Sequence, residues 1–534
     1  MTLAAQANGG PAYSVSLAGF NTHSATFRSG STLYLAEGGN VTFDSGVGTT
    51  NAVIESGARL VSLAATVNPL ATTTHTNFIN QADAITGPNF ATANNGVYSY
   101  QHTVTPGTGA NDGAYSLTVT RLADASAVTG GAAGSFLSGL ERYFRGLGAA
   151  YDPANGINLL TDGSAPWLYT LADLENLPTR AGVQAAGRNF FRQVSPQATT
   201  QSLQALSRGQ QVVTRQFKEG LLGSFAGSPL DGGLYPEYPP AAGDGPGGRF
   251  TLWGAPFYHT GSQDGDSLYT DLDQDFTGFN LGATWWGGQN DWGEAAVSAS
   301  FNYLNSDFDG QDGYSAEADG YGFSLGLAAK FNGAGQWNPR AALYGGWMTH
   351  DLDQRRRVGG MPFGNGTYRS NTDADVRNLG LSLDNDFYFN PCTILRPRLA
   401  FDYASTSLNG YTERGPADGF AQKVKADDFD SFRSDLGASL IWRASQSIAM
   451  EGRADWYHEF GDTEASLVSR TVAVPDLIFV TDGLDPGRDS GSVGASLTWT
   501  PPAADNFSLQ LDYDYHFGAG YSGSKIAGLL KVDF

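Results

Sequence analysis

The chain has 534 residues, long enough for two or three domains, and 70 of them are glycine, nearly twice the ~7% average. Charged residues make up only 16%, yet hydrophobic content is an ordinary 41% and mean hydropathy is −0.26. This composition excludes a disordered or all-α chain and favours many strands joined by glycine-rich turns. The net charge of −22 argues against a nucleic-acid partner. The single cysteine, Cys392, excludes an intrachain disulfide and a cysteine-based zinc site, and we expect no metal or cofactor.

The N-terminus and the hydropathy profile show neither a signal peptide nor a transmembrane helix. No run approaches the ~18 consecutive apolar residues of a transmembrane helix. Residues 1–7 lack a basic segment followed by an apolar core, so we expect no signal peptide there.

Residues 1–130 form the first predicted region, rich in Thr, Asn, Gly and Ala. Short β-type runs at 31–35, 41–43 and 57–61 are separated by glycine-containing turns. Short strands between tight turns are typical of β-solenoid rungs, so we expect a β-rich, solenoid-like segment. A small β-sandwich is the alternative.

Residues 131–248 form the second region and change to helical periodicity. Apolar residues from Phe136 to Leu147 recur at helical spacing. Ser195 and Pro196 then start a second helix that runs to Leu222 and is polar around most of its circumference. Residues 227–248, rich in Pro and Gly, are predicted to be a linker.

Residues 249–534 form the third region, in which apolar and polar residues alternate over ten or more positions, as in 507–517. Tight connections alternate with long polar ones, which we place near 261–275, 305–316, 353–371, 409–428 and 462–489. Nine of the ten tryptophans lie at or beyond Trp253, as aromatic girdles require. The pattern predicts a mainly β fold, a 12-stranded antiparallel transmembrane β-barrel with both ends on the short-turn side. A soluble β-sandwich is the alternative. The predicted strands centre near residues 255, 281, 298, 324, 343, 380, 399, 436, 452, 496, 512 and 530.

Residues 249–534 resemble the translocator domain of monomeric (type V) autotransporters of Gram-negative bacteria. The resemblance rests on Leu252-Trp253-Gly254, on the strand sequences at 339–344 and 397–403, and on the terminal alternating strand that ends in Phe534. Upstream, residues 194–217 resemble the helix that precedes such barrels. The resemblance implies a barrel in the outer membrane, with an α-helix through its pore and an N-terminal passenger at the cell surface.

A helix that is polar all round needs polar surroundings, which the inward face of a barrel supplies. We therefore place the 196–222 helix in the lumen, with Arg208, Gln211, Arg215 and Lys218 facing the wall and its three cations opposite inward carboxylates. A helix exposed outside the barrel is the alternative. The inward wall residues are predicted to include Arg396, Arg398, Glu451, Arg453, Asp455, Asp512 and Asp514.

The resemblance also implies partners. Phe534, with Val532 and Leu530 on the same strand face, looks like the signal read by the barrel-assembly machinery, and periplasmic chaperones would act before insertion. The outer surface would contact outer-membrane lipid and lipopolysaccharide, and the barrel is expected to be monomeric.

The predicted function is that of an autotransporter translocator that anchors in the outer membrane and displays its passenger. We expect no catalytic residues. The GDSL esterase-like motif at 265–268 lies in an outer loop, far from the Asp455 and His458 that would have to assist it. The Asn-Asn pair at 94–95 is far from the predicted pore helix, so we expect the passenger to stay attached. The alternatives are an outer-membrane adhesin or structural barrel that exports nothing else, and the C-terminal part of a secreted hydrolase.

Overall fold

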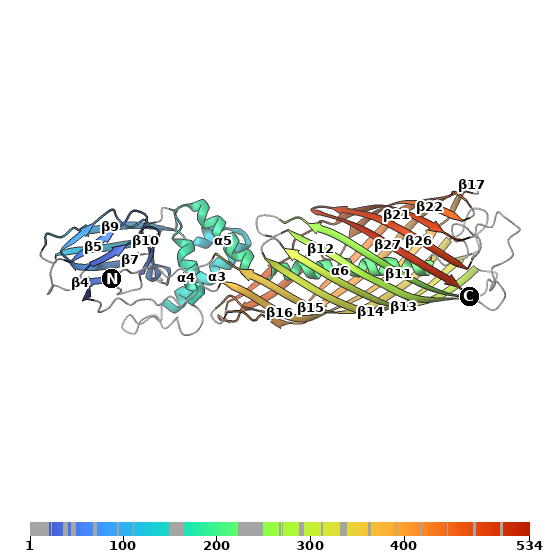
Figure 1. Ribbon diagram of the computed structural model, residues 1–534, viewed down its shortest axis with the longest axis horizontal. Coiled ribbons are helices and arrows are strands. Elements are labelled where there is room, and N and C mark those ends of the chain that lie inside the picture. Colours follow the sequence, from blue (N-terminus) through green and yellow to red (C-terminus); the bar gives the residue numbers. More distant parts are fainter. Residues whose placement is uncertain are drawn as a thin grey trace.

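The computed structural model describes residues 21–222 and 249–534. Segments outside the description are 23, 36–40, 44–49, 68–71, 93–94, 110–111, 149–164, 266–268, 270, 288–292, 311–312, 332–338, 361–364, 391, 417–418, 446, 474–476 and 502–505. The molecule is elongated, with a β-rich part, a group of helices and a barrel following one another along its axis (Figure 1). The predicted linker at 227–248 lies outside the described residues.

The first part is a parallel β-solenoid. Its short strands pair in parallel with the strand one turn later, in the series β1–β4–β7, β2–β5–β8 and β3–β6. Parallel pairing between successive turns confirms the solenoid-like segment and excludes an antiparallel sandwich. The strands are β1 Asn21–Thr22, β2 Ser24–Phe27, β3 Thr32–Leu35, β4 Val41–Phe43, β5 Asn51–Ile54, β6 Arg59–Ser62, β7 Thr72–Ala82 and β8 Ala84–Thr86.

An antiparallel hairpin of β9 (Tyr98–Thr105) and β10 (Gly113–Arg121) closes the solenoid, with β10 pairing along β7. The helices are α1 Leu63–Val67, within the solenoid, then α2 Ala125–Thr129, α3 Gly131–Gly148, α4 Ala165–Glu175, α5 Arg180–Val194 and α6 Gln197–Leu222. None of the described helices is long and apolar enough to span a membrane.

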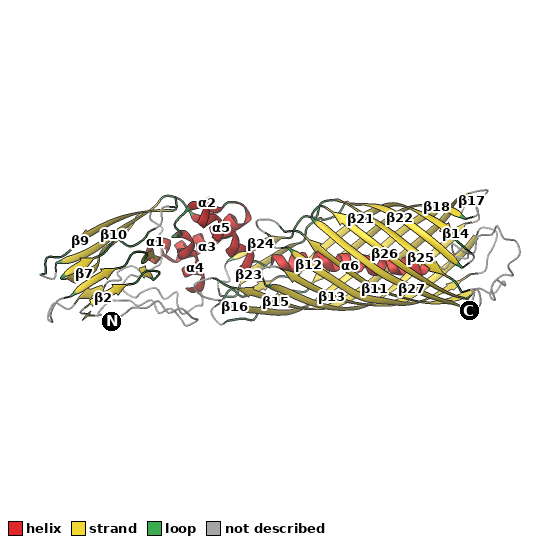
Figure 2. Cartoon of the chain, turned by 45° about the horizontal axis from the view of Figure 1, so that its top comes forward, coloured by secondary structure: helices red, strands yellow, loops and turns green. Residues whose placement is uncertain are grey.

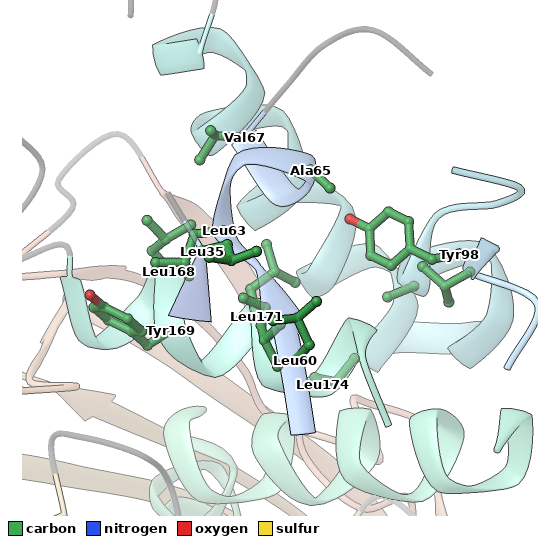
Figure 3. Packing of buried hydrophobic residues seen from close by; sticks show 14 of the residues in the cluster. Leu35, Leu60, Leu63, Ala65, Val67, Tyr98, Leu168, Tyr169, Leu171 and Leu174 are labelled. Atoms are coloured by element: carbon green, nitrogen blue, oxygen red, sulfur yellow. The ribbon is translucent and has the colours of Figure 1, made fainter. Parts of the chain in front are cut away.

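The solenoid and helices α2–α5 share one hydrophobic cluster. Leu35 and Leu60 of the solenoid pack with Leu168 and Leu171 of α4 (Figure 3). The boundary that we placed at residue 130 therefore falls inside a continuous core.

The barrel is a closed ring of twelve antiparallel strands. Consecutive strands pair with one another, and β27 pairs with β11 to close the ring. The short β17 (Phe387–Asn390) continues β16 after Asp386. All twelve predicted strands are present: β11 Arg249–Gln263, β12 Leu272–Trp286, β13 Gly293–Gly310, β14 Tyr314–Phe331, β15 Pro339–Val358, β16 Gly366–Asn385, β18 Thr393–Leu408, β21 Asp427–Arg443, β22 Ile448–Glu459, β25 Asp489–Trp499, β26 Phe507–Gly518 and β27 Tyr521–Asp533.

Side chains alternate across the barrel wall as period two requires. On β14 the outward Phe323 and Leu325 are exposed, while the inward Ser324 is buried. Trp285, Trp347 and other outward tryptophans fit a girdle, but Trp253 and Trp286 are buried in the lumen, which corrects part of that expectation.

Two of the expected long loops are wrong. Segments 305–316 and 353–371 are mostly strand, because β13 and β14 have 18 residues each and β15 and β16 have 20 each. The barrel wall is therefore tall at β13–β16 and low at β22 and β25–β27, which have 11 to 13 residues.

The segments at 409–428 and 462–489 also contain strands. β19 (Tyr411–Thr412), β20 (Gln422–Val424), β23 (Ser466–Thr471) and β24 (Ile478–Asp482) form a four-stranded sheet beyond the barrel rim, hereafter the outer sheet. An isolated bridge between Arg369 of β16 and Arg414 joins the outer sheet to the tall wall.

Candidate functional site

Helix α6 runs inside the barrel and is the centre of the candidate site (Figure 2). Its start follows from Pro196, which suits a first turn because it needs no amide donor there. Its apolar face packs against the wall formed by β11–β16.

Two glycines let α6 approach that wall closely. A Cβ at Gly209 would lie 3.0 Å from Leu304 Cδ2, and one at Gly220 would lie 2.8 Å from the ring of Trp253. The helix is therefore off-centre, seated on one side of the lumen.

The opposite, polar side of α6 faces a cavity of about 180 Å³ between the helix and the low wall. Gln211, Thr214 and Lys218 line it from the helix, and Asp402, Tyr457 and His516 line it from the strands. This side contains the four helix residues that we predicted to face the wall.

Arg208 has different partners from those expected. Its Nη2 donates to Gln263 Oε1 at 2.9 Å, and its guanidinium lies 4.6 Å from the centroid of the Tyr521 ring. Among the described residues it forms no ion pair, so the predicted carboxylate partner is wrong. An amide and an aromatic face hold this cation instead, an arrangement suited to guanidinium.

Gln211 and Lys218 face the cavity in different ways. Gln211 Oε1 accepts a hydrogen bond of 2.6 Å from Arg433 Nη1. Lys218 Nζ lies 5.9 Å from the centroid of the Tyr344 ring, and no carboxylate of the described chain is within 4.0 Å of it. The Tyr344 hydroxyl donates to Asp402 Oδ1 at 2.7 Å.

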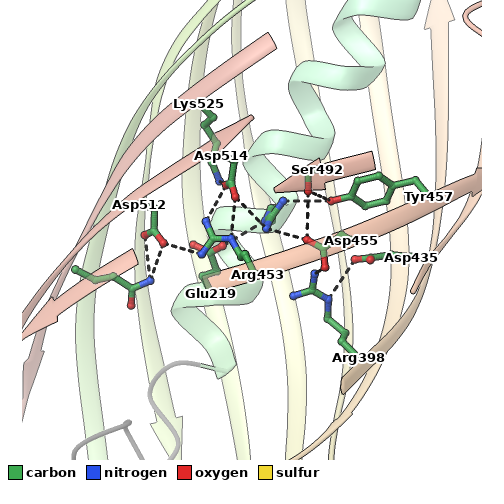
Figure 4. Close-up of polar contacts among 12 residues, drawn as sticks. Glu219, Arg398, Asp435, Arg453, Asp455, Tyr457, Ser492, Asp512, Asp514 and Lys525 are labelled. Atoms are coloured by element: carbon green, nitrogen blue, oxygen red, sulfur yellow. Dashed lines mark hydrogen bonds and ion pairs between the residues drawn. The ribbon is translucent and has the colours of Figure 1, made fainter. Parts of the chain in front are cut away.

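Arg215 reaches two of the predicted carboxylates, Asp455 and Asp514, which are labelled in Figure 4. Its Nη2 lies 3.4 Å from Asp455 Oδ2 and 3.5 Å from Asp514 Oδ1, and its Nε lies 3.4 Å from Glu219 Oε1 one turn along the helix. Its Nη1 also donates to the Tyr457 hydroxyl at 3.2 Å. One helix cation thus joins strands β22 and β26.

The wall reinforces this contact with its own ion pairs. Arg453 Nε and Nη2 each lie 2.8 Å from an oxygen of Asp514, a bidentate pair, and Arg453 Nη1 lies 3.0 Å from Asp512 Oδ1. Lys525 Nζ lies 2.9 Å from Asp514 Oδ2. Bidentate pairs fix geometry as well as charge, so these side chains form a rigid layer across the lumen. We call Arg215, Arg453, Asp455, Asp514 and Lys525 the lumen ion cluster.

The remaining predicted wall residues also lie on inward positions. Arg398 pairs with Asp455 and, at 3.3 Å, with Asp435. Arg396 pairs with Asp386 at 2.6 Å, nearer the short turns. Glu451 shares the inward face of β22 with Arg453, but it has no ion pair with a described residue.

Sequence reasoning missed several members of the site. Asp435 and Arg433 sit at inward positions of β21, which the alternation could have revealed. Glu219 lies four residues after Arg215, the spacing of a helix ion pair, which is a detectable signal. The aromatic partners Tyr344 and Tyr521 carry no signal that links them to a helix far away in sequence.

The outer end of α6 is held by the barrel rim and by the helices before it. Thr199 Oγ1 donates to Gln354 Oε1 at 2.6 Å, and Gln204 Nε2 donates to the carbonyls of Thr463 and Leu484. Arg356 pairs with Glu413 at 2.5 Å between the tall wall and the outer sheet.

Aromatic side chains join helices α3–α5 to the outer sheet. Phe136 of α3 lies 5.1 Å from Phe479 of β24, and Trp167 of α4 lies 4.6 Å from Phe420, measured between ring centroids. The helical segment is therefore packed onto the outer rim of the barrel.

The esterase-like motif finds no support. Asp455 points into the lumen, whereas His458 lies on the outward side and contacts Asp489 at 2.9 Å. Ser267 lies outside the described residues. Of the described residues, no group of three or more His, Cys, Asp or Glu could hold a metal ion.

Residues 252–514 match the family model described as the autotransporter beta-domain. The chain belongs to the autotransporter family. Its barrel is the outer-membrane translocator of such proteins, and the fold of this autotransporter domain is not an enzymatic one. No curated protein sequence matches this autotransporter.

Solved structures similar to this autotransporter include three translocators. The translocator domain of NalP from Neisseria meningitidis is 10% identical, with 64% of this chain and 100% of that chain covered and a TM-score of 0.44. The beta domain of Bordetella BrkA is 15% identical, with 53% and 99% covered and a TM-score of 0.41. The transport unit of AIDA-I from Escherichia coli is 12% identical, with 53% and 90% covered and a TM-score of 0.34.

Proposed function

We propose that this autotransporter displays residues 1–194 on the outside of the cell and that α6, left in the lumen, tethers them and closes the pore. The observation that carries the proposal is the path of the chain. α6 begins at the end of the barrel that holds the outer sheet and helices α2–α5, and it ends beside Trp253 at the opposite end, where β11 begins.

The orientation follows from connection lengths. Short turns face the periplasm in bacterial outer-membrane barrels, and the longer excursions face outward. Phe534 and the start of β11 lie at the short-turn end, where the amide of Phe534 donates to the carbonyl of Phe250 at 2.8 Å. The outer sheet and the passenger then lie outside the cell.

The native cysteine gives a direct test of display. Cys392 is exposed in the turn between β17 and β18, at the proposed periplasmic end, and Ser29 is exposed in the solenoid. In intact cells a membrane-impermeant maleimide is expected to label the Ser29→Cys variant on its new thiol only. Cys392 should react after the outer membrane is permeabilised. Labelling of Cys392 in intact cells, or protection of the new thiol, contradicts the proposed orientation.

Closure of the pore is tested by conductance. The Arg208→Ala/Arg215→Ala variant removes both cations that hold the cavity face of α6 to the wall. We expect larger or more frequent single-channel openings in planar bilayers than for the wild type. Conductance equal to that of the wild type contradicts a plug held by these residues.

We also propose the partners of assembly. Leu530 and Phe534 lie on the lipid side of β27, with 42% and 61% of their surface exposed, and Val532 shares that face. An alternating strand edge with a defined apolar face is a surface that another strand can pair with. Deletion of Phe534 is expected to reduce insertion by the barrel-assembly machinery, and chaperone-bound precursor should accumulate in the periplasm. Normal insertion contradicts this role.

Leu529 is a large apolar residue on the inward face of β27, next to Lys531. It is 1% exposed and packs with Phe217 and Trp253 at the inner end of α6. Its burial supports the proposal that the helix remains in the pore after assembly.

A further inference from the structure

Five exposed cations lie side by side on one surface of the outer rim. Arg355 is directly opposite Arg369 in the β15–β16 register, and Arg369 is bridged to Arg414. On the next strands of the outer sheet, Lys423 is directly opposite Arg470. We call Arg355, Arg369, Arg414, Lys423 and Arg470 the basic face.

These side chains share one side of a continuous sheet. Residues directly opposite each other across neighbouring strands point to the same face. The other side of the same strands carries the buried Arg356, Tyr368 and Glu413, which face α6 and the helices. The five cations therefore point away from the protein, and all five are exposed.

The five cations of the basic face have no ion-pair partner in the described chain. Within the described chain, none of the five side chains takes part in an ion pair or a side-chain hydrogen bond. Like charges directly opposite one another destabilise a sheet. A cluster of five basic side chains is also unusual for this protein, which has 31 basic and 53 acidic residues. A surface that collects uncompensated positive charge in an acidic protein is suited to an anionic partner.

The spacing suits an extended chain of negative charges. Neighbouring strands are about 4.8 Å apart, so Arg355, Arg369 and Arg414 form one row with cations at intervals of about 5 Å. Lys423 and Arg470 form a second pair at the same spacing, two residues along the strands, because Lys423 is opposite Thr412. A linear polymer with an acidic group on each sugar or each second sugar can meet several of them at once.

The nature of the surface favours a saccharide over a nucleic acid. On the described strands of the outer sheet, every aromatic side chain is buried, so no ring is offered for base stacking. Thr412 is exposed on the same face and supplies a hydroxyl group for sugar hydroxyls, whereas the Asn371 amide donates to Asp351 and Asp353.

A band of carboxylates separates the basic face from the membrane. On β15, Asp351 and Asp353 lie between the lipid-facing Trp347 and Arg355, and their register partners include Asp319, Glu317 and Asp373. Arg355 is eight positions beyond Trp347, so a rise of ~3.3 Å per residue and a tilt of ~40° put the basic face about 20 Å above the apolar belt. The acidic band repels phosphates of the membrane's own glycolipids, so the basic face is open to anions that arrive from the medium.

We propose that the basic face binds a linear acidic polysaccharide from outside the cell, which gives the barrel rim an adhesive function of its own. The proposal rests on the orientation given above, because the rim must lie outside the cell to meet such a partner.

Heparin, a sulfated linear polysaccharide, is a suitable probe for the purified full-length protein in detergent. The wild type is expected to bind immobilised heparin with strong salt dependence, and the Arg355→Gln/Arg369→Gln/Arg414→Gln variant about tenfold more weakly or worse, with a shallower salt dependence. The matched control, Arg28→Gln/Arg142→Gln/Arg180→Gln, removes three exposed cations of the solenoid and helices and should bind as the wild type does.

Absence of heparin binding by the wild type, or equal weakening in the control variant, overturns the proposal. Tighter binding of a short DNA duplex than of heparin would assign the face to nucleic acid instead. Equally tight binding of lipopolysaccharide micelles, lost in the same variant, would assign it to the membrane's own glycolipid. Because this assay uses purified protein, its failure is distinct from a failure of surface display, which maleimide labelling measures.

Discussion

Arg215 of α6 and Asp514 of β26 approach to 3.5 Å in the lumen and, with the Arg215–Asp455 contact at 3.4 Å, link the helix to the low wall. Asp514 is also paired with Arg453 and Lys525, so the carboxylate serves three cations. The helix is thus seated by packing on one side and by charge on the other.

Arg215→Ala alone should weaken the attachment of α6 to the low wall more than Arg208→Ala does. Removing one partner of a buried ion pair costs about 3–5 kcal/mol, and the lower end applies here because Arg453 and Lys525 still neutralise Asp514. Arg208 loses only hydrogen bonds to amides and a ring contact. Single-channel recording should rank the two variants in that order, with Arg142→Ala, on the exposed side of α3, as the control. The reverse order would show that the lumen ion cluster does not hold the helix.

Two glycine substitutions should have opposite signs. Gly220→Ala places a methyl group 2.8 Å from the Trp253 ring and should destabilise the protein by about 1–3 kcal/mol through overpacking. Gly146→Ala, in α3, meets no atom within 4 Å and should stabilise by about 0.4–1 kcal/mol. Thermal unfolding of the two variants in the same detergent measures both changes. Equal shifts in one direction would contradict the close seating of α6 on its wall.

The barrel was predictable from sequence because its signal is local. The alternation of apolar and polar residues can be read within a single strand, without knowledge of its partners, and it marks all twelve strands. The heights of the walls were misjudged for a physical reason. In Tyr314–Phe331, the inward Ala316 and Ala318 continue the alternation while the outward Glu317 and Asp319 become charged above the lipid. These charged residues predict a loop from sequence, but they lie on a strand that continues beyond the edge of the membrane.

The outer sheet and the partners within the lumen were not predictable in the same way. β19 and β20 have two and three residues, too few for a periodic pattern. They pair with each other, and β20 also pairs with β23, which is distant in sequence. The carboxylates facing Arg215 could be proposed from the alternation of inward and outward positions along β22 and β26. The choice of Gln263 and Tyr521 for Arg208 depends on how α6 is rotated in the lumen, and a sequence pattern does not specify that rotation.

Packing of the helical segment on the outer sheet should depend on Phe479. This side chain is 8% exposed and contacts Phe136, whereas its neighbour Ile478 points to the other face and is 64% exposed. Phe479→Ala should cost about 3–5 kcal/mol at this interface, and Ile478→Ala should cost little. Limited proteolysis of intact cells should then release passenger fragments faster from the first variant only. Equal release from both would mean that the aromatic contact does not hold the helical segment in place.

The solenoid should lose stability as the pH rises from 4.5 to about 7, because of Glu175 at the end of α4. Burial, together with the nearby Glu141 carboxylate, raises the pKa of Glu175 from 4.5 to about 7, against the opposing effect of Arg121. Tyr98 and Thr66 donate hydrogen bonds of 2.6 and 2.8 Å to its Oε2. Below pH 4.5 the Glu175 carboxyl is protonated in both the folded and the unfolded chain, so it does not lower the free energy of unfolding.

Between pH 4.5 and 7 the unfolded chain ionises first, so stability falls, and the loss levels off above pH 7 at about 3 kcal/mol. Hydrogen exchange of the β9–β10 hairpin at pH 5 and pH 8 should show the difference. Glu175→Gln should remove most of it, because the amide keeps an acceptor for Tyr98 and never ionises. Glu55→Gln, an exposed solenoid glutamate, should leave the pH dependence unchanged. A pH dependence that survives Glu175→Gln would place its origin in another group of the passenger.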